Sequence, residues 1–152
     1  MFVEITKQPL DLNALVRIVA NPTAGAIATF IGVTRDNFND KEVVKLEYEA
    51  YIPMALKELG NVCEQARKRW DLVAIALAHR IGTVAVGEAS VIIVASSPHR
   101  KDALEAVHWV IDELKATVPI WKKEFFKDGE IWKENAENRV AVAPGSSKEV
   151  DR

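Results

Sequence analysis

The sequence predicts a mixed α+β domain: a mixed sheet with flanking helices and a C-terminal hairpin. Alternating apolar and polar residues mark several strands, and apolar residues three or four positions apart mark helices between them. Two pairs of the expected strands nevertheless follow one another with no helix between them, whereas a purely parallel sheet needs a crossover at every step. Strands of both orientations are therefore expected in the sheet.

Periodicity and capping residues locate the individual elements. Asp11 is a suitable N-cap, because apolar residues follow it at helical spacing. The segment AIATFIGV (26–33) is almost entirely apolar and predicts a buried strand, whereas RDNFNDKE (35–42) is polar and predicts a loop. The expected strands are 2–6, 26–33, 43–51, 72–82 and 88–97, the expected helices are 12–20, about 53–70 and about 100–117, and the expected hairpin pairs 120–126 with 130–134.

Length and composition indicate one domain. The chain has 152 residues, of which 49% are hydrophobic and 28% charged, so it can bury a core without disulfides or a metal. We expect the domain to cover residues 1–134. The segment 135–152 is mostly polar, and we expect it to form a C-terminal tail that is partly flexible.

Charge and cysteine content exclude several classes of protein. The chain has 20 Lys and Arg against 22 Asp and Glu, a net charge of −2, which argues against general nucleic-acid binding. No apolar run approaches the roughly 20 residues of a membrane span, and the N-terminus lacks the pattern of a signal peptide. Cys63 is the only cysteine, so an intramolecular disulfide is excluded. We expect a cytoplasmic protein.

The segment Ser96-Ser97-Pro98-His99-Arg100 is a first candidate site, because it lies where a strand is followed by a helix. A serine N-cap with proline at the first helical position is a common helix start. Free backbone N–H groups, a hydroxyl, an imidazole and a guanidinium together suit an anion such as phosphate. The alternative, that His99 and Arg100 simply point into solvent, is equally compatible with this segment alone.

Two lysines flank Pro119 and form a second candidate site. Proline prevents one continuous helix, so Lys115 is expected in the last helical turn and Lys122 on the strand that follows. Two lysines at a chain reversal can converge on one pocket. Lys123 would point to the opposite face, while Glu124 would return to the side of Lys122. The alternative is a solvated charge run in which Lys115 complements the helix dipole, which is the commoner case.

Arg35 directly follows the apolar strand and is a third candidate, because loops at strand ends often carry function. An exposed arginine without a role is the alternative. His79 ends a strand and is expected to hold a turn or an interface, and Cys63 falls on an apolar helix face.

No metal or cofactor is expected. The histidines never pair at i and i+4 on one helix, and the seven glycines form neither a GxGxxG motif nor a P-loop.

Six motifs occur in a fixed order along the chain. They are F-x-G-x-x-R (30–35), L-E-Y-E-A-Y with a following Met-Ala (46–55), H-R-I-G (79–82), G-E (87–88), S-x-H-R (97–100) and K-x-x-x-P-I-W-K-K-E (115–124). In these motifs the sequence resembles the large, catalytic subunit of molybdopterin synthase. The match runs from about residue 2 to 134, and the shared order argues against chance.

The resemblance implies an α/β-hammerhead fold and a specific reaction. Members of the family form a homodimer, and each large subunit binds a small, ubiquitin-like sulfur-carrier subunit, giving a heterotetramer. The thiocarboxylated Gly-Gly C-terminus of the carrier enters a pocket of the large subunit. Two sulfurs then pass to cyclic pyranopterin monophosphate and form the dithiolene of molybdopterin for molybdenum cofactor biosynthesis.

The resemblance also implies site residues. They are Val33, Thr34, Arg35, His99, Arg100, Lys115, Lys122, Lys123 and Glu124. His99, Arg100 and Arg35 suit recognition of the substrate phosphate. We assign Lys115 the catalytic role beside the incoming thiocarboxylate, and Lys122 substrate binding with acid–base help.

The sequence departs from the family pattern near its C-terminus. Some members carry an arginine after the tryptophan of the last hairpin, where it reaches the pocket of the neighbouring subunit. Asn135 occupies the nearest position here, and Arg139 is the next basic residue.

A non-catalytic module that binds a phosphorylated small molecule or the C-terminal tail of a partner is the main alternative function. It would use the same basic pocket, but a pure binder would not need both Lys115 and Lys122. An RNA-binding module would need a basic face with exposed aromatic residues, which the net charge of −2 disfavours.

Overall fold

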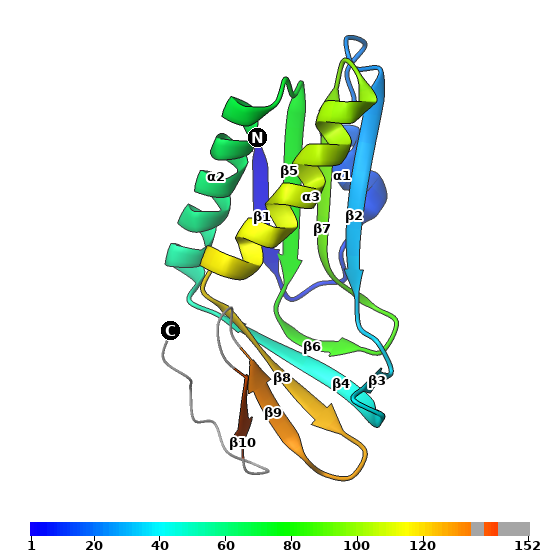
Figure 1. Cartoon of the computed structure of the whole chain (residues 1–152), viewed down its shortest axis with the longest axis vertical. Coiled ribbons are helices and arrows are strands. Elements are labelled where there is room, and N and C mark those ends of the chain that lie inside the picture. The colour runs from blue at the N-terminus through cyan, green and yellow to red at the C-terminus, as the bar shows by residue number, and fades with distance from the viewer. Residues whose placement is uncertain (135–138, 143–152) are drawn as a thin grey trace.

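Two β-sheets that meet end to end form the frame of the molecule, as the computed structural model shows (Figure 1). The structure describes residues 1–134 and 139–142. Within these residues the first sheet has four strands, in the order β1 (Phe2–Thr6), β5 (Ala74–Arg80), β7 (Ala89–Ser97) and β2 (Ala26–Val33). β1 is parallel to β5, and the other neighbours are antiparallel, so this sheet is mixed as predicted.

The second sheet is antiparallel throughout its described strands. Its order is β10 (Arg139–Val142), β9 (Ile131–Glu134), β8 (Ile120–Phe126), β4 (Lys41–Ala50) and β3 (Asn37–Phe38), and β6 (Gly82–Ala85) also pairs with β4. β8 and β9 are the predicted C-terminal hairpin. Gly129 adopts a φ of +89° in its turn, a backbone conformation that glycine reaches at little cost.

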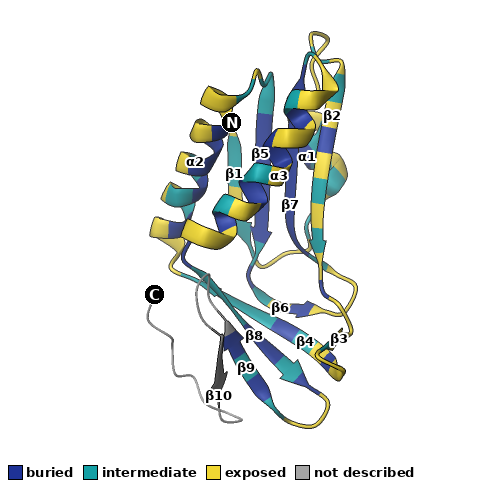
Figure 2. Ribbon diagram, in the orientation of Figure 1, coloured by how far each residue is buried: buried dark blue, intermediate teal, exposed yellow. Residues whose placement is uncertain are grey.

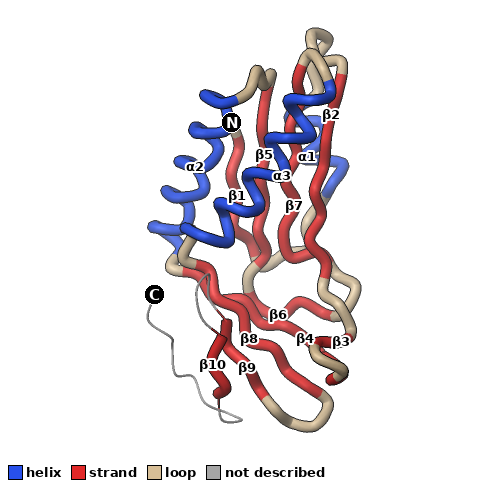
Figure 3. Tube along the Cα trace, in the orientation of Figure 1, coloured by secondary structure: helices blue, strands red, loops and turns tan. Residues whose placement is uncertain are grey.

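The described helices cover only the first sheet, as Figure 3 shows. α1 (Leu12–Val19) packs on one face against β5 and β7, and the Asp11 side chain accepts a hydrogen bond from the Ala14 N–H, as the N-cap prediction requires. α2 (Ile52–Arg69) and α3 (Arg100–Thr117) pack on the other face. In the part of the chain that the structure describes, no helix combines the length and apolarity that a membrane span requires.

The core follows the alternation of strand side chains. On β5, Ile75 and Leu77 face α2 and α3, whereas Ala76 and Ala78 face α1. β5 and β7 are therefore buried on both faces, which Figure 2 shows as continuous dark segments.

The prediction of a buried strand over 26–33 is wrong in one respect. The strand exists, but β2 lies at the sheet edge and only alternate residues face α3. Ile27, Ile31 and Val33 are exposed by 42%, 39% and 55% because α1 covers β5 and β7 but stops short of the second face of β2.

The predicted loop over 35–42 contains a short hairpin. Asn37 and Phe38 form β3 and pair with Glu42 and Lys41, and Asn39 and Asp40 turn the chain with φ of 49° and 62°. Two consecutive residues with positive φ are typical of the two-residue turns that join antiparallel strands. The corner after the strand ending at Arg80 likewise contains β6, so both connections contribute strands to the second sheet.

The segment 135–152 is only partly described. Its residues 139–142 form β10, in which the backbone of Arg139 pairs with Glu134. Asn135 lies outside the described residues, and partial flexibility of this segment stays a prediction.

Candidate functional site

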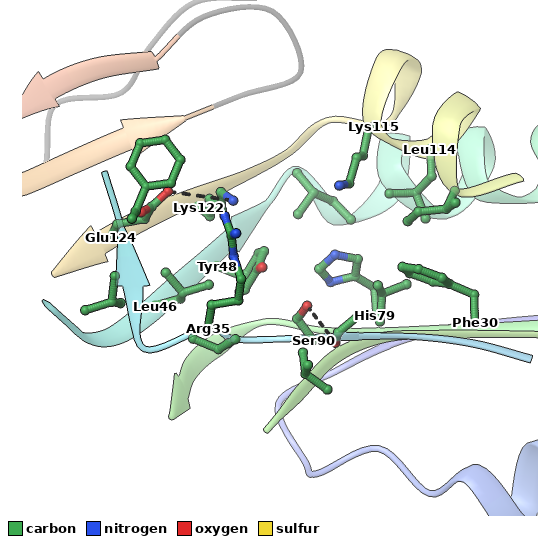
Figure 4. Close-up of a pocket in the computed structure, with 18 of the residues that line it drawn as sticks. Phe30, Arg35, Leu46, Tyr48, His79, Ser90, Leu114, Lys115, Lys122 and Glu124 are labelled. Carbon is green, nitrogen blue, oxygen red and sulfur yellow. Dashed lines mark hydrogen bonds and ion pairs between the residues drawn. The ribbon is translucent and has the colours of Figure 1, made fainter. Parts of the chain in front are cut away.

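A cavity of about 530 Å³ lies at the junction of the two sheets, beneath the C-terminal end of α3 (Figure 4). Both sheets and α3 contribute to its walls. Its polar and charged lining residues are Thr34, Arg35, Asn37, Tyr48, His79, Ser90, Lys115, Lys122 and Glu124. Apolar side chains such as Phe30, Leu46 and Leu114 line the rest. The pocket thus combines an apolar wall with a cluster of cations, which suits an anion bearing a less polar body.

The chain reversal at Pro119 brings the two predicted lysines to this pocket. α3 ends at Thr117, and Val118 already has an extended backbone, as the following proline requires. The Pro119 carbonyl accepts a hydrogen bond from the Tyr51 N–H, so the reversal is attached to the end of β4. Lys115 from the last turn of α3 and Lys122 from β8 both line the cavity, which confirms the predicted convergence.

Alternation along β8 separates its charged residues. Lys122 and Glu124 share the pocket face, and the Nζ of Lys122 lies 3.7 Å from an Oε of Glu124. The Glu124 side chain is buried, so its charge is compensated in a poorly solvated place. Lys123 faces the other way, with its Nζ 3.0 Å from an Oε of Glu49, and it does not line the pocket.

The end of β2 delivers Arg35 to the same pocket. A β-bulge follows Gly32, where an added Cβ would lie 2.7 Å from a methyl of Val91, so only glycine fits this close approach. The Thr34 N–H donates to the Glu88 carbonyl at 3.1 Å, and the Arg35 side chain extends toward Lys122 and Glu124 (Figure 4). Val33 and Thr34 line the cavity as well.

Sequence reasoning missed several polar residues of the pocket, namely Asn37, Tyr48, Ser90 and His79. His79 was expected to hold a turn or an interface, but its ring lines the cavity and packs edge-on against Tyr48, with ring centroids 5.1 Å apart. Burial lowers the pKa of His79 to about 4, so the imidazole is neutral at neutral pH. The apolar run before His79 signals burial, but only the meeting of β5 with the second sheet makes it a pocket wall.

His99 and Arg100 do not join this pocket within one chain. Both are exposed at the start of α3, and Lys115 follows Arg100 by 15 positions along the helix, which correspond to about 22 Å. The predicted serine N-cap is also corrected, because His99 is the N-cap residue. The Ser97 hydroxyl donates to the His99 carbonyl and accepts from the Ala103 N–H, so it is engaged in the helix start.

The residues that the structure describes contain neither a candidate metal site nor a nucleophilic thiol. Among the described residues, no group of three or more His, Cys, Asp and Glu could hold a metal ion. Cys63 is fully buried, and burial raises the pKa of its thiol to about 12. A thiolate is therefore not available there as a nucleophile.

The chain as a whole is similar to known proteins. The family model described as "MoaE protein" matches residues 5–117. A molybdopterin synthase catalytic subunit of Culex quinquefasciatus is 54% identical over 140 residues, which cover 90% of this chain and 89% of that protein. The corresponding subunit of Dictyostelium discoideum is 49% identical over 142 residues, covering 91% and 90%.

A solved structure agrees with these sequence relatives. The crystal structure of molybdopterin synthase from Staphylococcus aureus superposes with a TM-score of 0.83 at 36% identity, and covers 87% of this chain and 96% of that one. The mixed α+β fold predicted from the sequence is thereby confirmed against a solved relative.

Proposed function

Because this chain belongs to the MoaE protein family, we propose that Lys115 and Lys122 carry out the sulfur-transfer chemistry of its pocket. The chain acts as a molybdopterin synthase catalytic subunit and is a sulfurtransferase of molybdenum cofactor biosynthesis. Sulfur from a thiocarboxylated carrier chain passes to cyclic pyranopterin monophosphate and forms the dithiolene of molybdopterin. The convergence of Arg35, Lys115 and Lys122 on one cavity is the observation that supports this assignment.

The charges of the pocket suit the proposed substrate. Cyclic pyranopterin monophosphate has an anionic phosphate and a less polar ring system, and the cavity offers cations beside an apolar wall. Arg35 presents a planar set of donors for phosphate oxygens. Lys122 binds the substrate in this proposal, and the neighbouring Glu124 carboxylate allows a proton to be passed within the pair.

Lys115 is the proposed catalytic residue. In each transfer the thiocarboxylate sulfur forms a bond to a side-chain carbon of the pterin and displaces an oxygen substituent of that carbon, and water then cleaves the acyl–sulfur bond and restores the carboxylate of the carrier. A cation beside this group stabilises the negative charge that develops as the bonds to sulfur change. Lys115 lies in the last turn of α3 at the edge of the cavity, where the tail of a partner can reach it.

A small, ubiquitin-like sulfur carrier is the proposed partner. Cys63 is the only cysteine of the chain, and its burial and raised pKa make it unsuited to carry a persulfide. Sulfur must therefore arrive on another molecule. We also place the protein in the cytoplasm, since a single cysteine forms no intramolecular disulfide and fits a reducing compartment.

A homodimer of this chain is part of the proposal, within a heterotetramer that includes two carriers. The uncovered face of β2 exposes Ile27, Ile31 and Val33, and apolar surface of this kind favours association. His99 and Arg100 lie too far along α3 to act on the pocket of their own chain. In the dimer, we propose, they bind substrate phosphate in the pocket of the second copy.

Reconstitution tests the proposal. The chain, a thiocarboxylated carrier and cyclic pyranopterin monophosphate are mixed, and dithiolene pterin is measured. We expect Lys115→Ala to lower the rate at least about 100-fold while the carrier still binds. Lys57→Ala, an exposed lysine on α2, is the matched control and should keep full activity. Normal turnover in Lys115→Ala would contradict the catalytic role.

Mixed dimers test the role of the second copy. The test pairs a Lys115→Ala chain with an Arg100→Ala chain. If Arg100 acts on the pocket of the second copy, the pocket of the Lys115→Ala chain lacks both residues, and the pocket of the Arg100→Ala chain has both. Under the proposal this dimer keeps about half of the wild-type rate, because the intact pocket works. If Arg100 instead acted within its own chain, both pockets would be impaired. Nearly complete loss of activity would therefore contradict the crossed arrangement.

A further inference from the structure

His79 occupies a wall of the pocket to which the proposed reaction assigns no role. It lies one residue before the end of β5 and is only 4% exposed. Its ring and the amino group of Lys115 point into the cavity from opposite walls (Figure 4). The edge-on contact with Tyr48, at an interplanar angle of 68°, fixes the orientation of the ring. A buried imidazole held in this way presents a defined atom to whatever fills the cavity.

The hydrogen bond of His79 determines which atom that is. Nδ1 lies 2.8 Å from the backbone carbonyl oxygen of Arg80. A carbonyl oxygen only accepts, so Nδ1 carries the proton and donates it. In the neutral ring, Nε2 then has a free lone pair, and among the described residues it has no hydrogen-bond partner. Burial keeps the ring neutral, because it lowers the pKa of His79 to about 4. Nε2 is thus a fixed acceptor.

Most of the charged groups of the pocket are hydrogen-bond donors. Arg35, Lys115 and Lys122 can only donate hydrogen bonds. The Glu124 carboxylate accepts, but it is paired with Lys122 at 3.7 Å. The cations can therefore bind an anionic group, whereas a ring N–H of the same ligand needs an acceptor. The pocket also contains the oxygens of Thr34, Asn37, Tyr48 and Ser90, and Nε2 of His79 is an acceptor whose orientation the Arg80 hydrogen bond and the Tyr48 contact fix. The cost of leaving such a buried N–H without an acceptor makes this acceptor a source of specificity.

We propose that Nε2 of His79 accepts a hydrogen bond from a ring N–H of the planar heterocyclic substrate and so orients its ring system in the pocket. This inference rests on the proposed function, because it assigns a subsite to the pterin part of that substrate. The cations bind the phosphate end, and His79 selects a heterocycle that can donate. Analogues that have the phosphate but no ring N–H cannot form this hydrogen bond, so His79 does not increase their affinity.

Two substitutions separate the acceptor from the rest of the side chain. In His79→Asn the amide N–H can still donate to the Arg80 carbonyl, as Nδ1 does, but nothing reaches the position of Nε2. In His79→Gln the longer side chain can place its amide oxygen near that position. His108→Asn is the matched control, because His108 is exposed on α3 and lies outside the pocket.

Direct binding of cyclic pyranopterin monophosphate to the full chain is the measurement, by calorimetry at pH 7. We expect His79→Asn to weaken the Kd about tenfold and His79→Gln to stay within about threefold of wild type. His108→Asn should bind as wild type. Inorganic phosphate, which has no N–H, should bind all four proteins equally. An unchanged Kd in His79→Asn, or equal losses in the Asn and Gln variants, would overturn the inference.

A spectroscopic measurement distinguishes the proposed hydrogen bond from a purely structural effect of the substitutions. In the free protein, the ¹⁵N resonances of His79 should show a protonated Nδ1 and an unprotonated Nε2, and substrate should shift the Nε2 resonance. A protonated Nε2, or an Nε2 resonance that substrate leaves unmoved, would overturn the inference. If wild type neither binds nor converts the pterin, the proposed function fails and this inference with it. If wild type does both and only the His79 results disagree, the inference alone fails.

Discussion

The two sheets of this protein are stabilised in different ways. The first sheet is covered on both faces by helices, and its central strands β5 and β7 are buried almost completely. No described helix covers the second sheet. Its buried apolar cluster is small, with Val43, Leu46 and Phe126 at its centre. Charged pairs along its strands complement that cluster, such as Lys123 with Glu49.

The difference between the sheets explains where the pocket lies. A strand buried on both faces cannot present many charges, so the first sheet contributes a rigid wall whose polar members are the uncharged His79 and Ser90. The second sheet tolerates charge, and β8 contributes Lys122 and Glu124. Their junction therefore brings cations against a packed surface of low polarity, where electrostatic interactions are stronger than in water.

The largest expected effect comes from truncating matched leucines, one in the core of the first sheet and one in the apolar cluster of the second sheet. Leu77 in β5 is fully buried among α2 and α3, whereas Leu46 in β4 belongs to the small cluster and is 7% exposed. We expect Leu77→Ala to lower the free energy of unfolding by about 3–5 kcal/mol and Leu46→Ala by about 2 kcal/mol. Urea denaturation followed by circular dichroism measures both. Equal losses would show that the second sheet is packed as tightly as the first.

The pH dependence of stability should reflect the buried His79. Its folded pKa is about 4, against about 6.5 in the unfolded chain, so between these values the unfolded state binds the additional proton. Its contribution to stability is therefore present above pH 6.5 and is lost as the pH falls toward 4, up to about 3 kcal/mol. The free energies of unfolding of wild type and of His79→Asn are measured by denaturation between pH 4 and 7, and their difference at each pH isolates the contribution of His79. A difference independent of pH would contradict the assignment.

A smaller effect is expected from the charged network of the second sheet. Glu49 lies within 3.0 Å of the Nζ of Lys123 and 3.6 Å of the Nζ of Lys133, whose side chain is fully buried. Glu49 itself is partly exposed, which reduces the loss, and we expect Glu49→Gln to cost about 1–2 kcal/mol. Glu47→Gln removes the charge of an acidic neighbour that pairs with the more exposed Lys45, and it serves as the control with a smaller effect. A loss no larger than that of the control would contradict a stabilising role for the network.

The smallest expected effect concerns the Cys63 thiol in the core of the first sheet. Cys63 is buried on α2, and its pKa is raised to about 12, so a thiol reagent should not modify the folded protein at pH 8. Denaturation should expose one reactive thiol per chain. Rapid modification under native conditions would show that the α2 side of the first sheet opens more readily than its burial implies.

Local patterns determined much of this protein. The N-cap at Asp11, the helix over 100–117 and the reversal at Pro119 depend on neighbouring residues, and each was predicted. The separation of Lys123 from Lys122 and Glu124 follows from the alternation of any strand. The motifs that identify the family are likewise short, so the pocket lysines and Arg35 were found from the sequence.

Only the tertiary structure decided which surfaces are covered and which residues meet. Residues 26–33 are as apolar as a central strand, and their exposure follows from the position of β2 at the sheet edge. His79 became a pocket residue because β5 ends against the second sheet, and Arg100 was separated from Lys115 by the length of α3. Periodicity describes contacts within one element, whereas burial and convergence depend on elements far apart in the chain, whose arrangement no local pattern encodes.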